Sequence, residues 1–283
     1  MRSPPFGKLT KIAIGGAIVS GIVLVAILAP YIAPYDPYQQ NLAQRLKPPV
    51  WSAGGTAAHL LGTDTYGRDL LSRLIYGSRL SIIIGLSSMA FSCLIGSTAG
   101  VIAGFKGGRI EQAIMRFADA QMAFPDILLA IMLVAALGGS ALNLIIVLGV
   151  SRWMVYARVV FGLTRTLRQR PFVEAATLYG ARDAYLIGRH IIPQIVPVLT
   201  VVATLQVAQM ILQETALSFL GLGLPSPTAT WGNILAEGSG RLFVAPWIAN
   251  LAGLSIILLV WSINMFGNGL REHLDPKARL APR

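Results

Sequence analysis

Residues 168–197 read RQRPFVEAATLYGARDAYLIGRHIIPQIVP and form the longest charged interval between two long apolar runs. In a membrane protein such an interval belongs at an aqueous face, and its arginines indicate the cytoplasmic side. Pro171 can open a helix because the first helical turn does not need its missing N–H group. Gly180 supplies a break or a left-handed cap, and Pro193 is expected to stop a second helix. The stretch therefore predicts a short helix, a turn and a second helix at the inner membrane face.

The composition indicates a membrane protein. Of the 283 residues, 54% are hydrophobic and 12% are charged, whereas soluble domains carry about 25% charged residues. The net charge of +11 fits cytoplasmic loops beside anionic lipid better than a nucleic-acid partner. The lone Cys93 cannot form an intramolecular disulfide, and the three histidines share no metal-ligand spacing. Phosphate-binding loops and nucleophile elbows are absent from the sequence, so we expect no enzyme activity, cofactor or metal site.

Six apolar runs are long enough to cross a bilayer, which takes about 20 helical residues. The predicted spans are 12–33, 80–105, 116–137, 143–161, 196–220 and 246–266. Overlapping GxxxG motifs in the second span, at Gly96, Gly100 and Gly104, favour close helix packing. A Gly-Gly-Ser turn at 138–140 separates the third span from the fourth. The predicted fold class is therefore an all-α membrane protein with six transmembrane helices.

Charge placement predicts the orientation of the chain. Most of the 23 Lys+Arg residues lie in the N-terminal tail, the loop at 106–116, the segment 158–189 and the C-terminal tail. Positive residues collect on the cytoplasmic side, so both termini are expected there. Five basic residues in the first outside segment weaken this bias; they are Arg45, Lys47, Arg68, Arg73 and Arg79.

We divide the chain into four parts. Residues 1–34 hold the N-terminal tail and an uncleaved first helix, and residues 35–79 form an extracytoplasmic segment with an amphipathic helix. Residues 80–276 form a five-helix core, and residues 277–283 form a cytoplasmic tail. The amphipathic helix is Asp69–Ile75, whose apolar residues on one side suit the membrane interface. Asp64 or Thr65 is expected to cap it, and the roles of Asp64, Arg68 and Asp69 stay open.

The segment around Glu174 resembles the EAA loop of bacterial ABC importer permeases. His190 stands where many members of that family have Ile. The residues on the motif's spacing are Glu174, Ala175, Ala176, Gly180, Ile192 and Pro193. Strings at 62–81, 217–232 and 266–276 resemble C-type permeases of the dipeptide, oligopeptide and nickel importer group, although Asn268 replaces the usual Asp. The resemblance covers about His59 to Pro276.

This resemblance implies the type I ABC importer permease fold, with the EAA loop at residues 162–195. It also implies three kinds of partner: a second, homologous permease subunit, two cytoplasmic ATP-binding subunits and an extracytoplasmic solute-binding protein. The solute would be a dipeptide, an oligopeptide, glutathione or a nickel chelate. The residues implied to contact the ATPase are Glu174, Ala175, Ala176 and Gly180, with Arg182 and Asp183 at the edge.

Three glutamines in the fifth predicted span, Gln206, Gln209 and Gln213, lie on one helix face. Polar side chains are costly at depth in a membrane, so they are expected to face a translocation path or another helix. Glu214 and Arg152 are expected to pair with each other and join this set. The alternative is a secondary transporter or a membrane assembly protein without ATPase partners, although we find no internal repeat.

Overall fold

The structure is a computed structural model, and it describes residues 7–274. Within that range, five helices are long and apolar enough to cross a membrane, and a bent helix pair raises the number to six. The five are α1 (Lys8–Ile27), α3 (Leu70–Lys106), α6 (Ala141–Arg168), α9 (Ile192–Phe219) and α11 (Pro246–Leu274). The predicted cytoplasmic tail and the terminal Asp-Pro pair lie outside the described residues.

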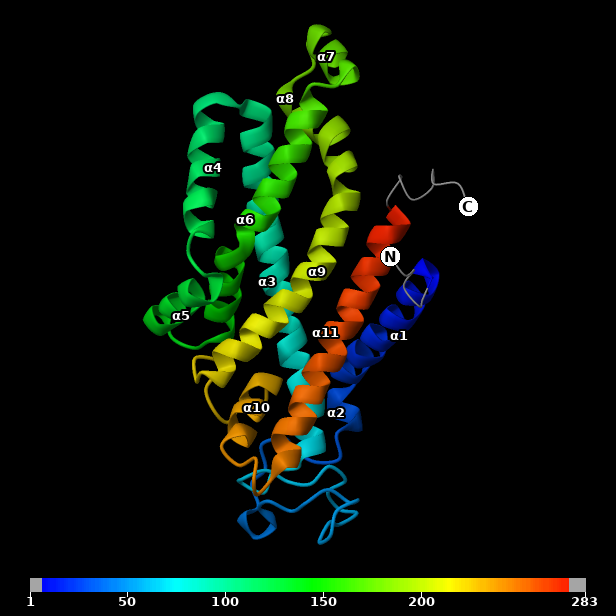
Figure 1. Cartoon of the computed structure of the whole chain (residues 1–283), viewed down its shortest axis with the longest axis vertical. Coiled ribbons are helices and arrows are strands. Elements are labelled where there is room, and N and C mark those ends of the chain that lie inside the picture. The colour runs from blue at the N-terminus through cyan, green and yellow to red at the C-terminus, as the bar shows by residue number, and fades with distance from the viewer. Residues whose placement is uncertain (1–6, 275–283) are drawn as a thin grey trace, which may run out of the picture.

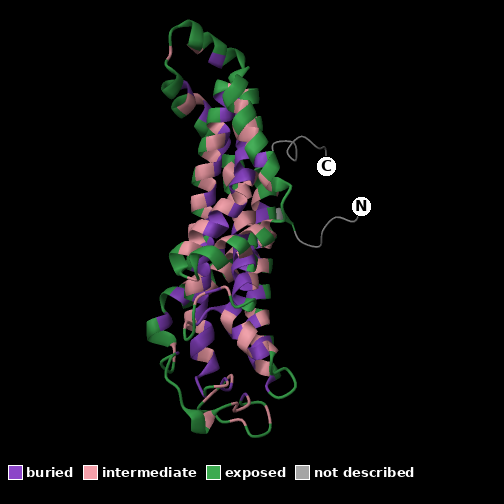
Figure 2. Ribbon diagram, turned by 90° about the vertical axis from the view of Figure 1, so that its left-hand side faces the viewer, coloured by how far each residue is buried: buried purple, intermediate pink, exposed green. Residues whose placement is uncertain are grey.

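The molecule is an elongated bundle with loops gathered at its two ends (Figure 1). One end carries α7 (Pro171–Leu178) and α8 (Asp183–Leu186), and the opposite end carries the long connection that contains the short helix η1 (Leu42–Gln44). Between them α1 packs along α11, and α10 (Trp231–Ser239) packs against α9 and α11. Exposed residues cover the tip of the α7 end, whereas buried residues line the inside of the bundle (Figure 2).

The tightest helix pair is α3 with α6, and glycines make it possible. A Cβ atom at Gly96, Gly100 or Gly104 would lie 2.2, 2.5 or 2.8 Å from backbone carbonyl oxygens of α6. These distances are shorter than a carbon–oxygen contact allows, so only glycine fits. The predicted close packing at the GxxxG motifs is therefore confirmed, and within this chain its partner is α6.

Two predicted boundaries near the N-terminus are wrong. The first span is not continuous to residue 33, because a break at Leu28 separates α1 from α2 (Ala29–Ile32). Pro30 lacks an N–H group and its ring clashes with the preceding turn, which explains this break. The separate interfacial helix at residues 69–75 does not exist either, since these residues begin the 37-residue α3. Such a helix is about 55 Å long, so it extends well beyond a bilayer core of about 30 Å.

The predicted third span at 116–137 is also wrong as a single helix. Two helices occupy this region, α4 (Gly108–Met122) and α5 (Asp126–Leu137), and they meet at an angle of 91°. Pro125 occupies the N-cap position of α5 and disfavours the helical conformation of Phe124 before it, so α4 ends at Met122. We call the bend at residues 123–125 the elbow. The hydropathy of this stretch correctly indicates enough apolar residues for one span. It contains no information about a bend between two helices.

The second helix of the EAA loop (residues 162–195) does not stop at Pro193. Helix α8 passes through a π-helical turn, η2 (Ile187–Ile191), straight into α9. The N–H group of Ile192 donates to the carbonyl oxygen of Ile187, five residues back. This wider turn relieves the clash between the Pro193 ring and the preceding turn, so the helix continues.

Candidate functional site

The short helix α7 ends in a left-handed turn at Gly180. Its φ is +80°, a conformation that glycine adopts without steric cost. The Ala181 N–H donates to the Ala176 carbonyl at 3.0 Å, and the Gly180 N–H donates to the Thr177 carbonyl at 2.9 Å. These two bonds form a Schellman motif, which satisfies the last carbonyl groups of the helix. The predicted helix, glycine turn and following helix are confirmed to this point.

Apolar side chains fasten this hairpin to the bundle. Val173 of α7 and Leu186 of α8 are buried, and they pack in one cluster with Phe105 and Val160 of the long helices. Beside this contact lies a cavity of about 780 Å³ whose charged walls include Glu111, Arg165 and Asp183. The hairpin is therefore held at its inner side and open at its tip.

The exposed tip carries the residues that sequence analysis singled out. Ala176 is half-buried against the apolar cluster. Glu174, Ala175, Gly180, Arg182 and Asp183 are exposed. Sequence analysis missed two neighbours, Leu178 and Tyr179, which are 89% and 94% exposed. Two adjacent apolar side chains this exposed at the tip of a hairpin favour a partner contact. Its sequence signal was a pair of bulky residues directly before the turn glycine.

A second set of polar side chains meets at the elbow. Arg152 of α6 donates from Nη1 to Asp126 Oδ2 at 2.6 Å and from Nε to Gln206 Oε1 at 3.0 Å. Gln213 of α9 donates to the same Asp126 oxygen at 2.8 Å. These four residues, Asp126, Arg152, Gln206 and Gln213, are called the elbow cluster. It brings together three helices at a place where one apolar stretch changes direction.

The remaining predicted path residues form no hydrogen bonds with this cluster among the described residues. Gln209 is exposed. Glu214 is buried and accepts from Ser218 at 2.8 Å, so the predicted pair between Glu214 and Arg152 is wrong. Sequence analysis assigned no role to Asp126, which lies inside the predicted span at 116–137. Its role became visible once the bend brought it beside Arg152.

A separate charge cluster lies at the end opposite the EAA loop. Asp64 accepts from Arg68 at 2.6 Å and from Arg73, and Glu237 of α10 accepts from the same two arginines at 2.9 and 2.6 Å. These four residues are called the buried network. Two arginines that weakened the predicted charge bias are therefore each matched by carboxylates. The predicted cap at Asp64 or Thr65 is wrong, because Asp69 caps α3 through the Ser72 N–H at 2.8 Å.

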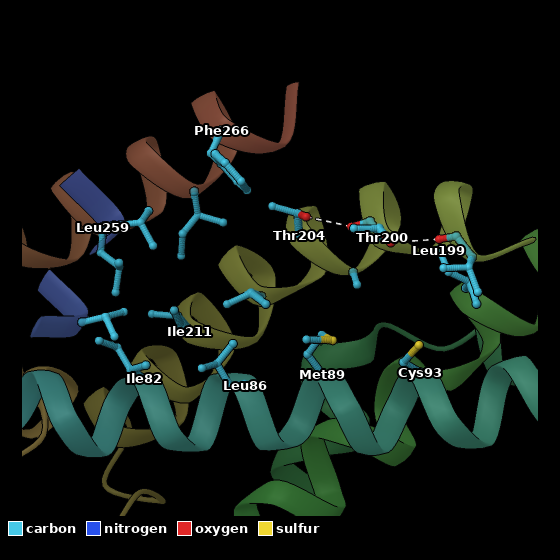
Figure 3. A pocket seen from close by; sticks show the side chains of 16 residues that line it. Ile82, Leu86, Met89, Cys93, Leu199, Thr200, Thr204, Ile211, Leu259 and Phe266 are labelled. Atoms are coloured by element: carbon cyan, nitrogen blue, oxygen red, sulfur yellow. Dashed lines mark hydrogen bonds between the residues drawn. The ribbon is translucent and has the colours of Figure 1, made fainter. Parts of the chain in front are cut away.

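An apolar cavity of about 500 Å³ lies between α1, α3, α9 and α11 (Figure 3). Two hydroxyls reach its wall, and both are occupied: Thr200 donates to the Val196 carbonyl and Thr204 to the Thr200 carbonyl. Its other walls are aliphatic, aromatic or sulfur-bearing, as at Met89 and Phe266. This surface suits acyl chains and offers little to a peptide backbone.

The sequence matches known families over most of its length. Residues 96–280 match the binding-protein-dependent transport system inner membrane component family. Residues 12–49 match the N-terminal transmembrane domain of oligopeptide transport permease C. The chain belongs to this permease family. It is a permease subunit of an ABC importer and not an enzyme, which decides against the alternatives of a secondary transporter or an assembly protein.

Permeases with similar sequences are named for the transport of peptides and glutathione. The di/tripeptide transport system permease protein DppC of Pseudomonas aeruginosa is 43% identical over 96% of this chain and 90% of its own length. The glutathione transport system permease protein GsiD of Pectobacterium atrosepticum is 36% identical over 93% of this chain and 86% of its own length.

A solved structure supports the fold of the permease. An inward-facing structure of the MetNI methionine ABC transporter aligns with a TM-score of 0.57 and 19% identity. It covers 71% of this chain and 96% of the chain in that structure. At this identity the likeness shows the fold, and it agrees with the predicted ABC importer permease architecture.

Proposed function

We propose that this permease forms half of a translocation path for small peptides in the bacterial inner membrane. A second, homologous permease supplies the other half, and an extracytoplasmic solute-binding protein delivers the solute. Two cytoplasmic ATP-binding subunits drive transport. The charge distribution supports an orientation with both termini cytoplasmic, and the peptide and glutathione names of the relatives support the solute class.

The observation that carries this proposal is the exposed apolar tip of the EAA loop. Leu178 and Tyr179 stand almost fully in solvent beside a rigid Schellman turn, on a hairpin that projects beyond the bundle (Figure 1). Exposed apolar side chains on a pre-ordered hairpin favour a docked partner protein. We assign the ATPase contact to this tip. Its residues are Glu174, Ala175, Ala176, Leu178, Tyr179, Gly180, Arg182 and Asp183.

We assign the solute path to the elbow cluster and the adjoining Gln209. A charged pair among membrane-spanning helices is costly unless it faces a polar path or another protein surface. Irregular backbone at membrane depth is likewise tolerated only inside protein or beside a water-filled cavity. The elbow combines a charged pair with a broken helix, which supports a position beside the path. We leave Glu214 out of the path because it is fully buried and accepts a hydrogen bond from Ser218 of the same helix.

The test is reconstitution of the complete importer in proteoliposomes. Tagged permease is purified from its native membranes with its partners, and uptake of radiolabelled alanyl-alanine, glutathione and nickel–histidine is measured with and without ATP. We expect two ATP-binding subunits and one further permease to co-purify, and alanyl-alanine to enter only with ATP. Purification of the permease without ATPases, or equal uptake with and without ATP, would contradict the proposal.

A further inference from the structure

The elbow cluster presents an unusual surface, because its carboxylate is much more open than its guanidinium. The side chain of Asp126 is 38% exposed, whereas that of Arg152 is 16% exposed. Arg152 lies near the middle of α6, among membrane-spanning residues. A half-open carboxylate cannot face acyl chains at such a depth. The exposed edge of Asp126 therefore faces a polar space or another molecule.

The two oxygens of Asp126 are used unequally. Oδ2 accepts from both Arg152 and Gln213, while Oδ1 accepts from the Ile127 N–H at 2.9 Å. A carboxylate oxygen can accept more than one hydrogen bond, so Oδ1 keeps capacity for a further donor. Gln213 Oε1 is buried and has no hydrogen-bond partner among residues 7–274. Two acceptors of the cluster, Asp126 Oδ1 and Gln213 Oε1, therefore keep capacity for a donor from outside it.

The exposed residues next to Asp126 along the chain are apolar. Phe124 and Leu128 are 69% and 54% exposed, and Met122 is also open. All of them belong to the elbow or the adjoining turns of α4 and α5. An open carboxylate oxygen matches a protonated amine, because the two form a charge-assisted hydrogen bond. An anionic group would meet the carboxylate first and be repelled.

We propose that Asp126 is a solute-binding residue of the translocation path and that it binds the protonated amine of the passing solute. The inference deepens the proposed function and rests on it, since a peptide with a free amino terminus supplies such an amine. Arg152 and Gln213 are positioning residues, because they fix Oδ2 and leave Oδ1 toward the path. The cluster therefore favours solutes with a free amino terminus over anionic ones.

Two other roles for Asp126 make different predictions. As a simple latch, the Asp126–Arg152 pair would hold the elbow onto α6, and only the pair itself would matter. As a contact with the second permease, Asp126 would be needed for assembly. Exchanging the two residues separates these roles. Arg at position 126 with Asp at position 152 would restore an ion pair, and with it a latch, but it would turn a positive charge toward the path.

The experiment compares variants of the whole importer in proteoliposomes, with alanyl-alanine as the probe. Asp126→Asn should lower ATP-dependent uptake at saturating binding protein by about tenfold or more, as expected for one lost charge-assisted hydrogen bond. Asp126→Glu should recover most of it. The matched control is Asp119→Asn, which removes an exposed α4–α6 ion pair with Arg158 and should leave uptake unchanged.

The swap Asp126→Arg with Arg152→Asp should remain as inactive as Asp126→Asn. Recovered uptake in the swap would overturn the binding role in favour of the latch, and failure of Asp126→Asn to co-purify with the second permease would overturn it in favour of assembly. Normal uptake by Asp126→Asn would overturn the inference alone. Absence of ATP-dependent uptake by the wild-type complex would overturn the proposed function, and this inference with it.

A labelling measurement covers the case in which the swap does not fold. Ala123→Cys, in the elbow, is placed in a Cys93→Ser background and exposed to a membrane-permeant thiol reagent. We expect alanyl-alanine with its binding protein to slow labelling at residue 123, and Asp126→Asn to abolish this protection. Protection that survives Asp126→Asn would contradict a solute contact at Asp126.

Discussion

The buried network and the elbow cluster are both built from arginines and carboxylates, and they differ in access to solvent. In the buried network, Asp64, Arg68 and Arg73 are at most 1% exposed, and both carboxylates bind both arginines. In the elbow cluster, one carboxylate binds one arginine and stays 38% exposed. A closed set of charges can only hold parts together, whereas an open one can still receive a ligand. The role of an ion pair in this permease therefore depends on how much of its side chains remains exposed to solvent.

The largest stability effect is expected where the network is most closed. Asp64→Asn leaves Arg68 and Arg73 sharing one carboxylate inside the protein, which should destabilise the fold by about 3–5 kcal/mol. Thermal unfolding of the detergent-purified importer measures this loss. A variant that unfolds at the wild-type temperature would contradict a structural role for the network.

A smaller loss is expected from the other carboxylate of the network. Glu237 is 22% exposed, so water can partly replace it, and Asp64 still pairs both arginines in Glu237→Gln. We expect a destabilisation of about 1–3 kcal/mol. The same unfolding experiment should rank Glu237→Gln between wild type and Asp64→Asn. The opposite order would show that α10, and not the network's centre, carries the stability.

The elbow cluster should contribute little to stability. Asp126→Asn removes a partly exposed ion pair, and such pairs contribute about 0–1 kcal/mol. Its unfolding temperature should lie close to that of wild type even though its uptake falls. A stability loss as large as that of Asp64→Asn would remove the distinction between the two clusters.

The smallest effect is expected at Asp119, whose side chain is 60% exposed beside Arg158. Asp119→Asn should change the free energy of unfolding by less than about 0.5 kcal/mol. Equal unfolding curves for wild type and variant would confirm it. A clear shift would mean that this surface is covered in the assembled importer.

Sequence patterns predicted the parts of the fold that depend on local chemistry. The apolar runs predicted the spans because bilayer length sets a minimum for each, and Gly180 predicted the turn because a left-handed cap requires glycine. The 91° elbow was missed because hydropathy has no direction. The predicted helix end at Pro193 was wrong because the π-helical turn before it accommodates a proline that would end an ordinary α-helix.

The candidate site divides in the same way. The EAA loop was predictable because its residues are neighbours in the chain. The partner of Arg152 was predicted incorrectly because Asp126 reaches it only through the bend. The buried network could not be predicted at all, since Arg73 and Glu237 are 164 positions apart. Contacts between distant segments follow from packing, which a single sequence does not display.

The Gly180 turn is expected to link ATP hydrolysis to transport, and the amount of alanyl-alanine taken up per ATP hydrolysed tests this link most directly. A Cβ atom added at Gly180 meets no atom within 4 Å among the described residues, but at φ +80° a left-handed non-glycine residue such as the valine of Gly180→Val costs about 1–2 kcal/mol. Gly188→Val is the matched control, because that glycine has equal space and no positive φ. We predict that Gly180→Val hydrolyses ATP with little uptake while Gly188→Val behaves as wild type. Normal uptake per ATP in Gly180→Val would contradict the claim.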